Sequence, residues 1–167
     1  MEKNIKKQFV ESWGVMGSVW GINTSVARVH ALLMVSEKPL GLDDISKKLN
    51  ISRGNASMCL KELRNWGVIQ KVSSSGDRKD YYVSENDVWK MLFRILRERK
   101  KREFDPALET VEKALASSAS DLSGAAKDRL QQMEELMSAL DSLASKFLDN
   151  EDDAKAALAF LTGLSKS

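Results

Sequence analysis

The spacing of apolar residues predicts two helices at the start of the chain. Over residues 4–20, apolar side chains return every three or four positions, which is typical of one face of an amphipathic helix. That face consists of Ile5, Phe9, Trp13, Met16 and Trp20. Either Thr24 or Ser25 can cap a second helix, whose apolar run ends before Ser36.

A tight turn then separates two further predicted helices. The third helix opens at residues 42–44, where a carboxylate can cap it, and residues 50–52 form the turn. Ser52 is well suited to cap a fourth helix that runs to about Trp66. Gly67 follows at the position where a glycine commonly ends a helix.

After the fourth helix, the pattern changes from a helical period to that of β-strands. Residues 68–72 predict one strand and residues 80–83 predict the returning strand, with a serine-rich, glycine-containing loop between them. The resulting hairpin, residues 68–83, follows directly on the fourth helix. A helical period with a strongly basic end resumes over residues 85–103. The sequence thus predicts a mainly α fold with a small β-hairpin.

The remainder of the chain is predicted to be helical. Asp105-Pro106 suits a new helix start with proline at the first position, and a break is expected at residues 117–120. Residues 122–148 carry a heptad-like apolar seam that must be buried, either against a second protomer or against the helices expected at residues 106–116 and 154–164. The seam consists of Ala126, Leu130, Met133, Met137, Leu140, Ala144 and Phe147. A last helix is expected over residues 154–164.

Net charge divides the chain into two parts of opposite sign. Residues 1–104 hold 20 Lys and Arg against 12 Asp and Glu, a net charge of +8, whereas residues 105–167 hold 6 against 12, a net charge of −6. A strongly basic segment favours a polyanionic partner. We therefore expect a basic domain over residues 1–104 and a helical dimerisation region over residues 105–167.

Composition argues against an enzyme and against a metal site. The chain has one cysteine, Cys59, and one histidine, His30, so it can form no internal disulfide and no Cys/His zinc cluster. It carries no phosphate-binding glycine loop, and no cofactor is expected. No apolar run reaches the roughly 18 residues of a membrane span, and the N-terminus lacks the apolar core of a signal peptide. We expect a cytoplasmic protein with no membrane partner.

Residues 41–66 and the hairpin together predict a DNA-binding surface. In a winged helix-turn-helix, the second helix of the pair enters the major groove and the hairpin, or wing, lies over the adjacent groove. Side chains of the fourth helix can reach base edges and phosphates, and glycine leaves room for close backbone approach. The predicted DNA contacts are Ser52, Arg53, Gly54, Asn55, Ser57 and Lys61 on the helix and Arg78 and Lys79 in the wing. Asp77 is expected to hold Arg78 in position.

These segments resemble a known family. The run ISRGNASM at residues 51–58, continued by LRNWGV at residues 63–68, is similar to the recognition helix of the GbsR-type branch of MarR-like transcription regulators. The run GDRKDYY at residues 76–82 is similar to the wing of that branch. The resemblance covers about residues 10–104. It implies a dimeric winged-helix DNA binder, usually a repressor and in some members gated by a small ligand.

Other residues have structural interpretations that we favour over functional ones. Aromatic side chains can form a cage around a cationic small molecule, and the candidates here are Trp13, Trp20, Trp89 and Phe93. No spacing in the sequence assembles such a cage, so packing in the core and at a dimer interface is favoured. In the same way we favour a buried, unreactive Cys59 and a packed or half-exposed His30 without a metal.

The sequence is therefore interpreted as a homodimeric winged helix-turn-helix protein that binds double-stranded DNA and regulates transcription, with repression and a small-molecule effector implied by the resemblance. Two-fold symmetry matches paired recognition helices to a palindromic site whose half-sites lie about 34 Å apart. The alternative is a winged-helix module that assembles proteins without reading DNA. The basic first part favours DNA, because an assembly module does not need it.

Overall fold

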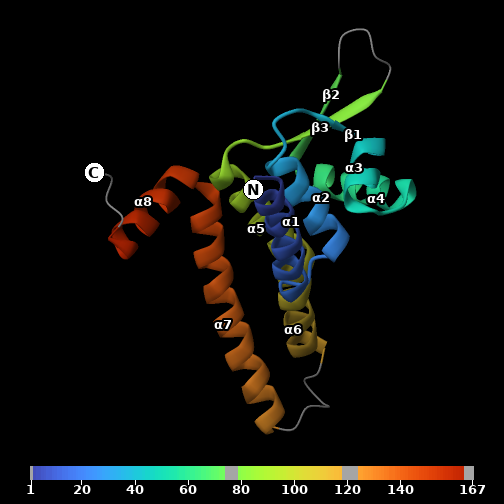
Figure 1. Ribbon diagram of the computed structural model, residues 1–167. Coiled ribbons are helices and arrows are strands. Elements are labelled where there is room, and N and C mark those ends of the chain that lie inside the picture. Colours follow the sequence, from blue (N-terminus) through green and yellow to red (C-terminus); the bar gives the residue numbers. More distant parts are fainter. Residues whose placement is uncertain (1, 74–78, 118–123, 164–167) are drawn as a thin grey trace. The chain divides into compact units, whose positions relative to one another are not determined.

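The computed structural model describes residues 2–73, 79–117 and 124–163 (Figure 1). The chain forms two compact units, Met1–Arg94 and Ile95–Ser167, so the structural division precedes the change of net charge at residue 104. The predicted mainly α fold with a small β-hairpin is confirmed. Within the described residues, no helix has the length and apolar character needed to cross a membrane.

The first unit combines helices with a small sheet, and the second is helical in its described residues. The first contains α1 (Glu2–Val19), α2 (Thr24–Met34), β1 (Leu40–Gly41), α3 (Leu42–Leu49), α4 (Arg53–Asn65), β2 (Ile69–Ser73), β3 (Asp80–Ser84) and the start of α5 (Val88–Arg99). The second continues with a π-helical turn, η1 (Lys100–Phe104), and with α6 (Asp105–Ser117), α7 (Gly124–Asp149) and α8 (Glu151–Thr162).

Helix α2 packs against α1, α3, α4 and β3 and so forms the core of the first unit. Its start is capped by Asn23, whose Oδ1 accepts the backbone N–H groups of Ser25 (2.8 Å) and Val26 (3.4 Å). The expectation that Thr24 or Ser25 caps this helix is wrong, because the asparagine that precedes them already supplies the acceptor. Helix α2 therefore begins one residue after that asparagine.

Glycines bring α1 unusually close to α2. A Cβ atom at Gly17 would lie 2.5 Å from Cβ of Ala27, and one at Gly14 would lie 2.6 Å from Cγ of Arg28. Real Cβ contacts are not that short, so a larger residue at either position requires the neighbour to move. The Arg28 guanidinium also donates to the Glu11 carboxylate (2.6 Å), which ties the two helices together.

This close approach turns the predicted apolar face of α1 outward. Ile5 is 61% exposed and Trp20 is 56% exposed, and Met16 is exposed as well. Phe9 and Trp13 are half-buried, with ring centroids 5.3 Å apart. The side of α1 that packs on α2 is the one that carries Gly14 and Gly17, and the apolar spacing alone does not reveal this. Ile5, Met16 and Trp20 therefore remain exposed on the apolar side.

The sheet has three antiparallel strands in the order β1-β3-β2. Strands β2 and β3 form the predicted hairpin, with Lys71 opposite Tyr82. Strand β1, which the sequence pattern does not predict, pairs Leu40 with Tyr82 on the other edge of β3. A strand of two residues has no alternating pattern to detect. Its conformation depends on pairing with β3, which lies far along the chain.

The helical backbone continues through Asp105-Pro106. Helix α5 passes into η1, where the N–H of Asp105 donates to the carbonyl of Lys100, and η1 passes into α6. In a regular α-helix the ring of Pro106 would clash with the carbonyl of Arg102 and offer it no N–H. A wider π-helical turn before the proline accommodates this conflict. An α-helix, α6, thus begins at Asp105 as predicted, but it continues the helical backbone of α5 and η1.

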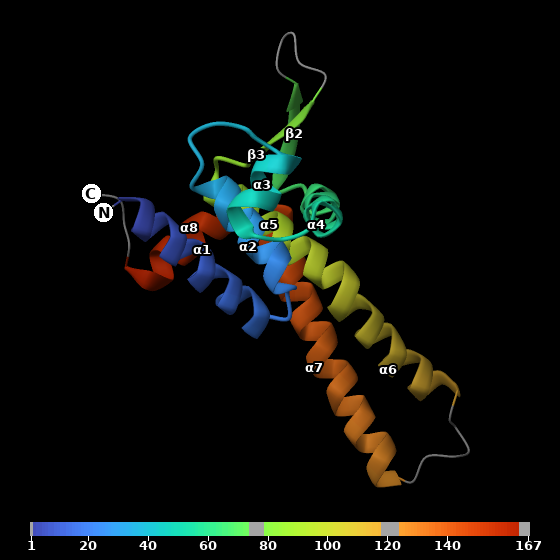
Figure 2. The ribbon, with the colours of Figure 1, turned by 45° about the vertical axis from the view of Figure 1, so that its right-hand side comes forward.

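Helices α6 and α7 lie side by side and run in opposite directions (Figures 1 and 2). Of the predicted seam on α7, Met133 and Leu140 are exposed, whereas the other seam residues are at least partly buried. Exposed apolar side chains instead follow α7 in steps of three and four. We call them the α7 row, which consists of Met133, Leu136, Leu140 and Leu143.

Candidate nucleic-acid interface

The turn between α3 and α4 is held by hydrogen bonds. Asn50 adopts the left-handed conformation (φ 52°), which asparagine tolerates better than most residues. The Ser46 hydroxyl donates to the Ile51 carbonyl (2.6 Å), and the Ile51 N–H donates to the Ser46 carbonyl (3.1 Å). Ser52 then caps α4 by accepting the N–H of Asn55 (3.1 Å), as predicted. These bonds fix the angle at which α4 leaves the turn.

Helix α4 has one buried face and one exposed face. The buried face consists of Ala56, Cys59, Leu60 and Leu63. The exposed residues include every predicted DNA contact of this helix and its cap: Ser52, Arg53, Gly54, Asn55, Ser57 and Lys61. Because an α-helix turns once every 3.6 residues, Gly54, Met58 and Lys61 lie in line near the centre of the exposed face. A partner docking on α4 would meet these three positions first.

Gly54 leaves the first turn of α4 open to close approach. A Cβ atom at this position would meet only the Ser52 hydroxyl oxygen, at 4.0 Å. The fold therefore has room for a side chain at Gly54, in contrast to Gly14 and Gly17, where a Cβ atom would require a neighbouring residue to move. The space over Gly54 is available to a ligand surface.

Arg53 forms an ion pair across α3 and α4. Its Nη1 lies 2.8 Å from Oδ1 of Asp43, and both side chains are well exposed to solvent. An exposed pair of this kind contributes about 0–1 kcal/mol. A phosphate or a base edge can therefore replace Asp43 as the partner of Arg53 at little cost.

The side-chain amide of Asn55 already has two partners. Its Nδ2 donates to the Ser25 hydroxyl (3.3 Å), and its Oδ1 accepts from the Cys59 thiol (3.4 Å). Asn55 thereby links α4 to the first turn of α2. Burial raises the pKa of the Cys59 thiol to about 11, so the thiol remains protonated at neutral pH. The expectation of a buried cysteine is confirmed.

The described part of the wing comprises its two strands and the residue before the second. The strands are joined by an ion pair between Nζ of Lys71 and Oδ1 of Asp80 (2.8 Å). Lys79 is exposed and directly precedes β3. Asp77 and Arg78 lie outside the described residues, so the roles expected for them stay predictions.

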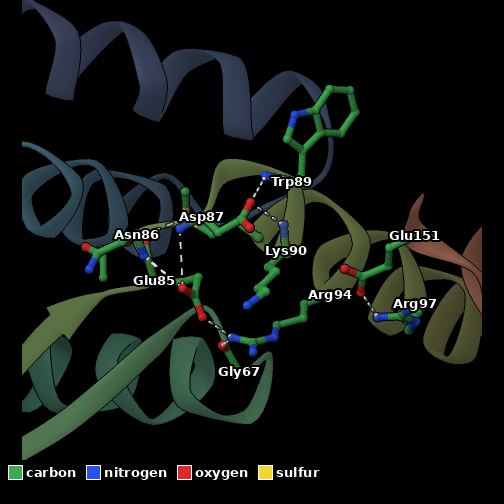
Figure 3. Close-up of polar contacts among 11 residues, drawn as sticks. Gly67, Glu85, Asn86, Asp87, Trp89, Lys90, Arg94, Arg97 and Glu151 are labelled. Atoms are coloured by element: carbon green, nitrogen blue, oxygen red, sulfur yellow. Dashed lines mark hydrogen bonds and ion pairs between the residues drawn. The ribbon is translucent and has the colours of Figure 1, made fainter. Parts of the chain in front are cut away.

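A hydrogen-bond network centred on Arg94 links three elements (Figure 3). Its Nη1 donates to the carbonyl of Gly67 (2.6 Å), just after α4, and to the carboxylate of Glu85 (2.8 Å), just after β3. That carboxylate also accepts the N–H groups of Asp87 (3.3 Å) and Asn86 (3.0 Å). These bonds, with Arg94, hold the pKa of Glu85 below its usual range. Arg94 thus connects α5 to the end of α4 and to the base of the wing.

Replacing Arg94 with alanine is expected to lower the free energy of unfolding by about 1–3 kcal/mol, because the Gly67 carbonyl and the Glu85 carboxylate lose their shared donor. Urea denaturation measures this loss. The matched control is Lys90→Ala, which removes one positive charge from an exposed site on the same helix. Equal stabilities for the two variants would contradict a structural role for the Arg94 network.

The aromatic residues considered for a ligand site lie in the first unit, on α1, in the turn after α1 and on α5. On α5, Trp89 stacks against the fully buried Phe93, with ring centroids 6.5 Å apart. On α1, Trp13 is half-buried against Phe9, and Trp20, in the turn directly after α1, is exposed. The burial of Phe93 agrees with packing in the core. A ligand role for these residues stays a prediction.

Two features of the interface were missed from the sequence. The first is Met58, which is 73% exposed on α4. Its helical spacing from Gly54 and Lys61 is visible in the sequence and could have identified it. The second is the Arg94 network, whose partners come from distant parts of the chain. No local pattern marks such a contact.

Comparison with known proteins gives matches to bacterial regulators. Residues 25–71 match the family model described as bacterial regulatory protein, arsR family. The chain is 27% identical over 81 residues to the putative HTH-type transcriptional regulator YvaV of Bacillus subtilis (strain 168), covering 48% of this chain and 46% of that protein. It is 26% identical over 98 residues to the HTH-type transcriptional repressor GbsR of the same organism, covering 59% and 54%. The chain thus spans about half the length of these curated relatives.

A solved structure extends the likeness to most of the chain. The crystal structure of a transcriptional regulator matches with a TM-score of 0.66 at 19% identity, covering 86% of this chain and 95% of that one. At this identity the match shows a shared fold. The helix-turn-helix over α3 and α4, followed by the β2–β3 hairpin, makes that fold a winged helix-turn-helix.

Proposed function

We propose that this winged helix-turn-helix protein is a DNA-binding transcription regulator that reads its site with α4. The observation that carries the proposal is the exposed face of α4, which presents Arg53, Ser57 and Lys61 beside an open Gly54. Donors of this kind on a capped helix suit the phosphates and base edges of a major groove. The net charge of +8 over residues 1–104 supports a polyanionic partner.

The proposed roles differ along this face. Arg53 and Lys61 contact base edges or phosphates, and Ser52 and Ser57 position the backbone. Asn55 contacts a base only after exchanging its bonds to Ser25 and Cys59. In the wing, Arg78 and Lys79 reach the adjacent groove, where a narrow minor groove attracts positive charge.

We extend the proposal to repression and to the GbsR-type branch. The resemblance of the recognition helix and wing motifs supports the branch, and the relative GbsR is named as a repressor. A small molecule that changes the spacing of two recognition helices would release the DNA. The candidate residues for its binding are the aromatic side chains of Trp13, Trp20, Trp89 and Phe93.

The regulator is further proposed to act as a homodimer. The outward apolar side of α1 and the α7 row are exposed in the single chain, and apolar rows of this length are commonly buried in an interface. The α7 row has the three-and-four spacing that helices use to pair. A two-fold dimer would present two copies of α4 to a palindromic site.

Fluorescence anisotropy tests the proposed function directly. The titration uses a fragment from upstream of the protein's own gene, a scrambled control of equal length and a series of salt concentrations. We expect preference for the upstream fragment and an affinity that falls steeply with salt, with a slope of about −0.9 per phosphate contact. Weak binding without preference or salt dependence would favour the alternative, a winged-helix module that assembles proteins.

The Arg53–Asp43 pair gives two substitutions with opposite expected effects. If the Arg53 guanidinium contacts a base edge with two hydrogen bonds, Arg53→Ala should weaken binding to the preferred fragment by about 1–3 kcal/mol more than binding to scrambled DNA. Asp43→Asn removes a negative charge from the same surface and releases Arg53, so it should tighten binding to both DNAs. Anisotropy measures both effects. Equal losses on both DNAs for Arg53→Ala would reduce Arg53 to a phosphate contact.

A further inference from the structure

Met58 is an apolar side chain at the centre of an otherwise polar face. It is 73% exposed, whereas its neighbours Cys59 and Leu60 are buried on the other side of α4. The exposed positions one turn away, Gly54 and Lys61, carry no apolar side chain. An isolated exposed apolar residue is ordinary on a protein surface. The position of Met58, at the point of the helix that meets a groove first, is what calls for an explanation.

The major groove offers one apolar feature to such a side chain. Among the four bases, only thymine presents a methyl group there, whereas the other groove atoms are hydrogen-bond donors and acceptors. Methionine is unbranched and flexible, and its thioether adapts to an irregular surface. The open space over Gly54, one turn earlier, allows α4 to approach the groove closely enough for a side-chain contact.

We propose that Met58 is a specificity-determining residue that contacts the C5-methyl group of a thymine in the bound DNA. This inference rests on the proposed function, because it assigns a base to one residue of the same reading face. The contact supplies discrimination without a hydrogen bond. The Met58 contact therefore distinguishes thymine from cytosine, and it adds to the polar contacts that Arg53 and Lys61 make with base edges or phosphates.

Substitution of deoxyuridine for thymine tests the contact, since this change removes only the methyl group. Each thymine of the upstream fragment is replaced in turn, together with its two-fold mate where the site is palindromic. For the wild-type chain we expect one position at which the loss of the methyl group weakens binding about fourfold per half-site. For Met58→Ala, thymine and deoxyuridine should bind equally well at that position.

Two further variants separate this contact from a general loss of affinity. Lys61→Ala should weaken binding to every fragment while keeping the wild-type ratio between thymine and deoxyuridine. Met58→Leu keeps an apolar side chain and should retain most of the ratio. Thermal unfolding of Met58→Ala should match the wild type, because the side chain is exposed.

The outcomes distinguish this inference from the function on which it rests. Sequence-preferring binding in which no thymine methyl group matters, or in which Met58→Ala keeps the wild-type ratio, would overturn the Met58 contact and leave the regulator intact. Failure of the wild-type chain to prefer any upstream fragment would overturn the proposed function and the contact with it. Loss of the ratio in Met58→Ala alone would establish the contact.

Discussion

Acidification from pH 6.5 to pH 4 is expected to lower the free energy of unfolding by about 3 kcal/mol through His30 alone. His30 is 4% exposed on α2, and burial lowers its pKa from 6.5 to about 4. Its Nε2 atom has no hydrogen-bond partner among the described residues. Between the two pKa values the unfolded chain binds a proton that the folded chain does not. The free energy of unfolding therefore falls as the pH falls.

Urea denaturation at pH 6.5, 5 and 4 measures this loss against His30→Gln, which has a polar side chain of similar size that does not titrate. Carboxylates such as Glu85, whose folded pKa is depressed, destabilise both proteins equally in acid, so the difference between them isolates His30. The chain has one histidine, so its ring signals in an NMR titration need no assignment. A midpoint near 6.5 would contradict the burial of His30.

The parts of the interface that the sequence predicted are those fixed by neighbouring residues. The Ser52 cap depends on the N–H of Asn55, three positions along the chain. The end of α4 depends on Gly67, whose positive φ of 71° suits a glycine after a helix. Local chemistry of this kind is readable without knowing the fold. The location of α4, its exposed face and the hairpin that follows were therefore predicted.

The orientation of α1 could not be predicted in the same way. Its apolar period is genuine, but apolar spacing identifies a face and not the partner that covers it. The packing of α1 is set by Gly14 and Gly17, which permit close approach to α2 at positions that carry no apolar signal. The side of α1 with the small residues Gly14 and Gly17 packs against α2, and the larger apolar residues Ile5, Met16 and Trp20 are exposed. On α7, too, apolar spacing did not tell which positions a neighbouring helix covers, so the predicted seam was only partly correct.

Long-range contacts limited what the sequence could say about individual site residues. Asn55 was predicted as a base contact from its position on the helix, but its amide is bonded to Ser25, thirty positions earlier in the chain. Arg53 was predicted as a phosphate or base contact, but its guanidinium is paired with Asp43. Each partner competes with DNA for the same donors. Only the fold reveals that competition.

Charged substitutions in the α7 row are expected to have the largest effect on the proposed dimer. Leu136 and Leu143 are 61% and 66% exposed in the single chain. Burying each leucine side chain in an interface contributes about 1.5–3 kcal/mol to the free energy of association. Leu136→Glu combined with Leu143→Glu places two negative charges on each copy, so self-association should weaken on the order of a hundredfold or more. Glutamate is a good helix former, so α7 itself should persist. Sedimentation velocity over a concentration series measures the change.

The control for this variant adds the same charge elsewhere on α7. Gln131→Glu combined with Ser142→Glu places two carboxylates at exposed positions away from the row, and self-association should be unchanged. Because each copy supplies one recognition helix, the row variant should bind a palindromic fragment much more weakly while binding a single half-site as the wild type does. An intact dimer in the row variant would show that α7 is not the interface. A monomeric wild type would instead remove the need for palindromic DNA, and α4 would have to read its site alone.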